Sequence, residues 1–336
     1  MSGATRNGAP RAFCVPAMVY GDGRVAHTSR RVRAEGEVRL IVEDATRLMA
    51  TRLLNELQNE CGADVTRAFP DNPEHGVVFA VLLREAFKRA PTDAEDRKPP
   101  SINGLATSLG RPFETIRRYA HALEARGLVR LTPGGIVLTA DAFTDPAIAA
   151  LTRSLVARFR FFLAELARAG LLLDDGGRTD APSPGECLMA ALDLYLCALE
   201  FNGPEMRSWI ELLIIGAVLV INIRPIARNL TLSRHFGAID RAPPLEVRRP
   251  ASALAVAEQT GLPASTVRRH LKRATEAGLL IRDDTGYVLS TEFLSADDVR
   301  SNAARIMRYL RRVMGDLGSG AYRTGEAAFD AARTGA

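Results

Sequence analysis

The chain has 336 residues, of which 47% are hydrophobic and 25% charged, so it is long enough and apolar enough to fold into two or three domains. Its net charge of +5 permits a nucleic-acid partner without requiring one. The four cysteines and five histidines are scattered without a CxxC pair or another close cluster, which argues against a zinc site and favours unreactive thiols in a reducing cytoplasm. We therefore expect no metal and no cofactor.

The first half of the chain begins with a polar stretch, residues 1–36, which has six arginines against two acidic side chains and no signal-peptide pattern. We interpret it as a basic arm, either solvated or inserted into the minor groove of DNA. Helical patterns follow over 38–59 and 77–89. The next expected elements are a short helix over 104–109, a helix over 112–127, a β-hairpin over 128–139 and a long helix over 146–169.

The second half begins after a segment rich in Gly, Asp and Pro, and shows helical patterns over 186–199 and 206–221. Its apolar stretch, 210–223, is interrupted by Glu211 and Asn222 and is too short to span a bilayer, so we expect a buried helix and no membrane partner. A loop with six arginines is expected over 224–249, followed by helices over 253–260 and 263–278, a hairpin over 279–290 and a helix over 296–317.

An internal repeat links the two halves. Residues 105–139 align with 256–290 at a constant offset of 151 residues, without a gap and with 11 of 35 positions identical. The shared residues, in first-copy numbering, are Ala106, Gly110, Pro112, Thr115, Arg117, Arg118, Gly127, Leu128, Gly135, Val137 and Leu138. The order helix, turn, helix, hairpin is that of a winged helix-turn-helix.

We therefore predict a mainly α-helical fold with small β-hairpin wings, built from two tandem winged helix-turn-helix modules with flanking helices. The predicted organisation is a basic arm (1–36), a first module (37–170), a linker (171–185), a second module (186–320) and a polar tail (321–336).

The second copy reads LPASTVRRHLKRATEAGLLIRDDTGYVLS over residues 262–290. This text resembles the recognition helix and wing of bacterial transcriptional regulators of the MarR and IclR types. The resemblance covers about 45 residues of each copy, roughly a quarter of the chain. It implies binding to double-stranded DNA, with the second helix of each copy in the major groove.

A helical projection separates the packed face of each second helix from a face that could contact DNA. Thr115 and Thr266 lie near the helix N-termini, where a hydroxyl and free N–H groups can meet a phosphate. The predicted DNA-binding residues are Thr115, Arg117, Arg118, His121 and Arg130 in the first copy, and Ser265, Thr266, Arg268, Arg269, Lys272, Arg273 and Arg282 in the second.

The two copies differ in their outward residues. Glu114 stands where the second copy has Ser265, and a carboxylate there would repel phosphate or accept from cytosine. Arg130 aligns with Ile281, whereas Arg282 aligns with Leu131, so the wing arginines belong to opposite strand faces. We expect a shifted register or a different wing contact in one copy, and the second copy is the stronger DNA reader.

No phosphate-binding loop, GxSxG or HExxH motif is present, so we do not expect an enzyme. The favoured interpretation is a cytoplasmic, nucleoid-associated transcriptional regulator whose two modules act as an intramolecular pseudo-dimer. The alternatives are a plasmid-type replication initiator and a chromosome-organising adaptor whose winged helices bind proteins. A homodimer is possible, and the sequence indicates no effector.

Overall fold

The computed structural model describes residues 38–40, 44–88, 98–174, 181–202, 208–236, 242–320 and 322. This part of the chain is mainly helical, with twelve α-helices and three two-stranded antiparallel sheets. The predicted arm (1–36) and, apart from Tyr322, the predicted tail beyond 320 lie outside the described residues.

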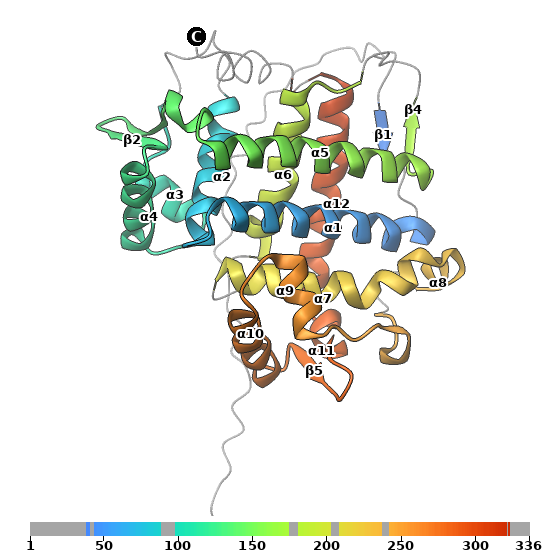
Figure 1. Ribbon diagram of the computed structural model, residues 1–336. Coiled ribbons are helices and arrows are strands. Elements are labelled where there is room, and N and C mark those ends of the chain that lie inside the picture. Colours follow the sequence, from blue (N-terminus) through green and yellow to red (C-terminus); the bar gives the residue numbers. More distant parts are fainter. Residues whose placement is uncertain are drawn as a thin grey trace, which may run out of the picture. The chain divides into compact units, whose positions relative to one another are not determined.

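The first half runs from β1 to α5 (Figure 1). Its elements are β1 (Val38–Leu40), α1 (Asp44–Ala68), α2 (Pro73–Phe87), α3 (Ile102–Ser108), α4 (Phe113–Ala125), β2 (Val129–Thr132), β3 (Gly135–Leu138), a 3-10 turn (Ala140–Phe143) and α5 (Pro146–Arg168).

The second half repeats the order of a strand, two long helices, two short helices, a hairpin and a long helix. Its elements are β4 (Leu172–Asp174), α6 (Pro184–Asn202), α7 (Trp209–Arg228), α8 (Leu230–His235), a 3-10 turn (Leu245–Val247), α9 (Ala253–Thr260), α10 (Ala264–Glu276), β5 (Leu280–Arg282), β6 (Tyr287–Leu289), α11 (Thr291–Ser295) and α12 (Asp297–Gly318). This half differs by α8 and a 3-10 turn inserted before α9, and by the short helix α11 where the first half has a 3-10 turn.

Two expectations about the flanking segments are wrong. Residues 38–40 form a strand rather than the start of a helix, because Val38 pairs with Asp174 at the edge of the predicted linker. The segment 224–249 is not all loop, since α7 continues to Arg228 and α8 follows. Both errors concern segments whose structure depends on partners far away in the sequence.

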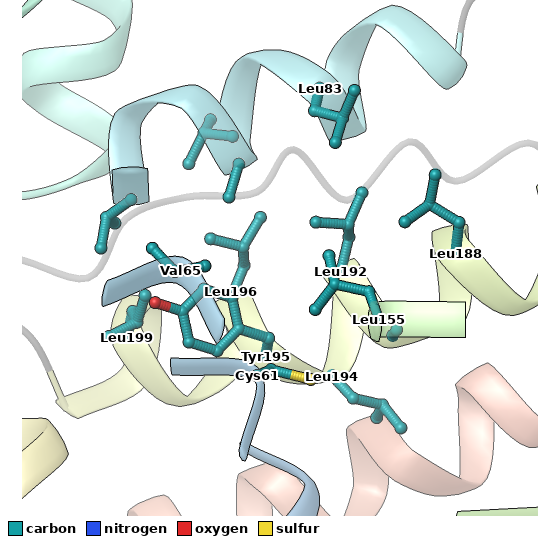
Figure 2. Packing of buried hydrophobic residues seen from close by; sticks show 14 of the residues in the cluster. Cys61, Val65, Leu83, Leu155, Leu188, Leu192, Leu194, Tyr195, Leu196 and Leu199 are labelled. Carbon is teal, nitrogen blue, oxygen red and sulfur yellow. The ribbon is translucent and has the colours of Figure 1, made fainter. Parts of the chain in front are cut away.

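The two halves share a core. Helix α1 packs against α7 of the second half, and α6 packs against α2 of the first, so the contacts are reciprocal. In Figure 2, Leu192 and Leu196 of α6 lie among side chains from three helices of the first half, including Leu83, Leu155 and Val65. The halves are therefore held together by buried apolar surface and not by a linker alone.

Helix α7 is the one helix in the described part of the chain that is long and apolar enough to cross a membrane, by length and composition alone. It packs on α1 along one side and on α9 and β6 along another. Its Ile214, Val218 and Ile221 lie in the core of the second half. The apolar composition is thus accounted for by contacts with protein on several sides.

Candidate nucleic-acid interface

Two units with the same local structure stand out: the first unit (α3, α4, β2, β3) and the second unit (α9, α10, β5, β6). The hydroxyl of Ser101 accepts from the N–H of Gly104 at 3.0 Å, and that of Ser252 accepts from Ala255 at 3.1 Å. These N-caps begin α3 and α9 at equivalent positions. The repeat therefore extends upstream of the aligned segment to a pair of serines.

The following helices begin after Pro112 and Pro263, as the sequence predicts. The residues expected on their packed faces are all buried: Ile116, Ala120 and Leu123 in α4, and Val267, Leu271 and Ala274 in α10.

The hairpins also match. Val129 pairs with Leu138, and Leu280 pairs with Leu289, at the same offset in both copies. Of the two expected alternatives, the shifted register is therefore wrong, and the different wing contact is the one that the structure has. The exposed Arg130 simply occupies the place of Ile281, whereas Arg282 lies on the other face with its guanidinium 5.6 Å from the ring centre of Tyr287.

A third chain segment joins each hairpin. The N–H of Ile136 donates to the carbonyl of Pro100 at 2.9 Å, and the N–H of Tyr287 donates to that of Ala251 at the same distance. Each second hairpin strand is thus bonded on both edges, which fixes the hairpin against the segment that precedes the first helix of its own unit.

The exposed face of α10 is strongly cationic. Ser265, Arg268, Arg269, Lys272 and Arg273 are all exposed, and Thr266 is half-buried near the helix N-terminus. Lys272 lies 3.8 Å from the exposed Glu276. Within the described residues, Arg268, Arg269 and Arg273 form no ion pair. Three guanidinium groups on one face therefore keep their charge available to an anionic partner.

The corresponding face of α4 is largely neutralised. The Nε of Arg117 donates to Glu114 at 2.9 Å, and the ring of His121 lies 3.5 Å from Glu124. Arg118 is exposed, with its guanidinium 5.7 Å from the ring centre of Tyr119. Thr115 is half-buried at the helix start. The expected residues are thus on one face, but with much less free charge than in α10.

Two arginines counted toward the basic character of the first unit have internal roles. The guanidinium of Arg111 lies 4.8 Å from the ring centre of Trp209, at the start of α7. Arg126 donates to the carbonyl of Ala68 at 3.0 Å and contacts Asp145 at 3.3 Å. Counting charges along the sequence therefore overestimates the cationic surface of this unit.

The basic segment 224–249 likewise has arginines with internal partners. Arg248 is buried and donates to the carbonyls of Pro243 at 2.7 Å and Leu289 at 2.6 Å. The Nε of Arg224 lies 3.8 Å from Glu56. Arg228 and Arg249 are exposed. Part of this segment therefore supports the second hairpin, through the hydrogen bond from Arg248 to Leu289 of β6.

The buried faces of α4 and α10 pack on equivalent helices of their own halves, α2 and α7. The hydroxyl of Tyr119 donates to Glu74 at 2.6 Å, and burial together with this bond raises the pKa of Tyr119 to about 12. His270, at the equivalent position of α10, has a pKa lowered by burial, and the charge of Glu211 at the start of α7 opposes that shift. Each unit therefore rests on the second long helix of its own half.

Asn222 fixes the second hairpin to α7, a role that the sequence did not indicate. Its amide donates to the carbonyls of Arg249 at 2.8 Å and Tyr287 at 3.2 Å, and its oxygen accepts from the N–H of Leu289 at 2.9 Å. Asn222 is 1% exposed. A polar residue inside an apolar run was the only available signal.

The part of the chain that the structure describes contains no group of three His, Cys, Asp or Glu side chains able to hold a metal ion. Cys61, Cys187 and Cys197 are buried free thiols, and burial raises the pKa of Cys61 and Cys197.

Comparisons with protein-family models, curated proteins and solved structures found no match for this chain.

Proposed function

We propose that this protein binds double-stranded DNA through two winged helix-turn-helix units that act as a pseudo-dimer within one chain. The main support is the exposed row of α10, where Arg268, Arg269 and Arg273 are cationic and without an ion pair among the described residues. We further propose that it is a cytoplasmic transcriptional regulator associated with the nucleoid, and not an enzyme.

Helix α10 suits the major groove because one of its faces is packed and the other carries donors. Val267 and Leu271 anchor the packed face, while Arg268, Arg269 and Lys272 extend from the opposite face. Arginine and lysine donate to guanine edges and to phosphates. Thr266 and Ser265 lie at the helix N-terminus, where hydroxyl and backbone N–H groups favour a phosphate.

Helix α4 is the weaker reader in this proposal. Glu114 pairs with Arg117 on the face that would meet DNA, and its carboxylate would repel nearby phosphates. Arg118, His121 and Arg130 remain as exposed contacts. The first unit then contributes orientation and part of the phosphate contact, while the second supplies most of the affinity and the sequence preference.

The reciprocal packing of α1 on α7 and α6 on α2 supports the pseudo-dimer. A symmetric dimer of separate chains makes each interface contact twice, and these two helix pairs do so within one chain, whereas the packing of α5 on α6 has no equally extensive counterpart between α12 and α1. A shared core also sets the relative position of the two units before DNA is met, which lowers the entropy lost on binding.

The direct test is the double variant Arg268→Ala/Arg269→Ala in an electrophoretic shift assay. We expect at least a tenfold loss of affinity at moderate salt, because each lost contact costs about 1–3 kcal/mol. The matched control is Arg153→Ala/Arg160→Ala, which removes two exposed arginines from α5 and should leave affinity nearly unchanged. Equal affinity of wild type and the α10 variant would refute the assignment.

Salt dependence and genome-wide mapping of bound sites separate the possible roles. Counterion release predicts that affinity falls steeply as salt rises, whereas a flat response would indicate a protein partner. Enrichment at promoters would support a regulator, and enrichment at repeats within a replication origin would support an initiator instead. If the protein binds no DNA duplex, the result would support the alternative of an adaptor whose winged helices bind other proteins.

A further inference from the structure

A cluster of charged side chains lies where α1 of the first half packs on α7 of the second. Arg52 and Glu56 are one turn apart on α1, and Arg224 and Arg228 are one turn apart at the end of α7. The carboxylate of Glu56 lies 3.4 Å from Arg52 and 3.8 Å from Arg224, so it stands between the two helices. None of these four residues is among those proposed to contact DNA.

The cluster has more positive than negative charge. Its three guanidinium groups share a single carboxylate, and both distances to Glu56 exceed the roughly 2.7–2.9 Å of a charge-assisted hydrogen bond. Burial lowers the pKa of Arg52, and the charges of Arg228 and Arg224 act in the same direction, whereas Glu56 opposes them. Two positive charges are therefore left without a counter-charge among these residues.

The cluster opens from the interior toward solvent. The side chains of Arg52, Glu56 and Arg224 are 9%, 22% and 34% exposed, and Arg228 at the end of α7 is exposed. An anion arriving from solvent can thus contact Arg228 and Arg224, while Arg52 adds its charge from behind. Charges that are partly removed from water are screened less by salt, so this excess acts more strongly than it would on an open surface.

From this arrangement we infer that the cluster binds a dianionic phosphate group, with Arg224 and Arg228 donating to its oxygens and Arg52 supplying charge from behind. The planar fork of a guanidinium matches the spacing of phosphate oxygens. A phosphate dianion also balances both unmatched positive charges, whereas a carboxylate would balance only one. The inference does not depend on DNA binding.

Calorimetric titration of the full-length protein with inorganic phosphate tests the inference, at about pH 8, where phosphate groups are mainly dianionic. Sodium chloride keeps the ionic strength constant. The titration is repeated with the Arg268→Ala/Arg269→Ala variant, because that variant lacks two exposed cations of α10. We expect one phosphate per chain with equal affinity in both proteins, and acetate binding that is weaker by about tenfold or more.

Two variants and a matched control locate the site. Arg228→Ala changes an exposed residue and should weaken phosphate binding about tenfold, because one charge-assisted contact is lost. Arg308→Ala removes an exposed arginine from α12 and should bind phosphate like wild type.

Glu56→Gln separates a binding site from a purely structural ion pair. It removes the carboxylate that repels the ligand, so phosphate affinity should rise about fivefold. It also leaves Arg52 without its carboxylate partner, so the variant should unfold at a lower temperature, and phosphate should restore part of that loss. A purely structural pair predicts the same loss without restoration by phosphate.

Free phosphate and a phosphate monoester share this chemistry, and titration with phenyl phosphate distinguishes them. Tighter binding of phenyl phosphate than of inorganic phosphate assigns the site to an ester, and weaker binding assigns it to the free anion.

Four results would overturn the inference. They are the absence of saturable phosphate binding to wild type, equal affinity for acetate and phosphate, undiminished binding in a folded Arg228→Ala variant, and loss of binding in Arg268→Ala/Arg269→Ala. The last result would place the phosphate on α10 instead. Because the inferred site lies outside α10, a failure of DNA binding and a failure of this inference are distinguishable.

Discussion

Asn222→Leu tests whether the second hairpin depends on α7. The asparagine makes three hydrogen bonds in a site where it is 1% exposed. Leucine has the same branched arrangement of heavy atoms and a larger volume, so the substitution removes the hydrogen bonds without opening a cavity. On the side of the hairpin that faces β5, the N–H of Ser290 donates to the carbonyl of Leu279. The N–H of the preceding residue, Leu289, points the other way, toward Asn222.

The expected cost follows from those bonds. An unpaired buried N–H at Leu289 costs about 1–3 kcal/mol, and each of the two lost amide bonds contributes about 1 kcal/mol. The added apolar burial of leucine offsets part of this loss. We expect Asn222→Leu to lower the free energy of unfolding by about 2–4 kcal/mol.

Urea unfolding followed by circular dichroism measures the change, and hydrogen exchange at the Leu289 amide shows whether it is local. Asn103→Leu is the matched control, because Asn103 is exposed on α3 and should change stability by less than about 0.5 kcal/mol. If Asn222→Leu unfolds within about 1 kcal/mol of wild type and the Leu289 amide stays protected, the hairpin does not depend on this anchor.

Two further predictions concern the hairpins and the first unit. Gly286→Ala should cost about 2 kcal/mol in thermal unfolding, because its φ is +151° and a Cβ would lie 2.7 Å from the carbonyl oxygen of Ala251. Gly134→Ala, with no atom closer than 3.7 Å to its Cβ, should be nearly neutral. Glu114→Ser should raise DNA affinity about fivefold by releasing Arg117, as measured by fluorescence anisotropy. Glu165→Ser breaks an ion pair of the same spacing on α5, and an equal gain there would attribute the effect to net charge alone.

The sequence predicted the elements whose signals are local. Burial of Ile116 and Val267 and exposure of Arg268 and Arg269 follow from the 3.6-residue period of a helix, which is written into the sequence itself. The gapless repeat likewise predicted two hairpins in the same places, because Gly135 and Gly286 serve the same tight turn in both copies.

Only the tertiary structure decided which polar residues are available to a partner. Arg111, Arg126 and Arg248 look like surface charge in the sequence, but each contacts a group brought close by the fold. Asn222 interrupts an apolar run in the sequence, and only the folded structure shows that its side chain bonds the second hairpin to α7. Local periodicity sets which face of a helix is buried, but it does not specify the partner across the core, since that contact joins residues far apart in the chain.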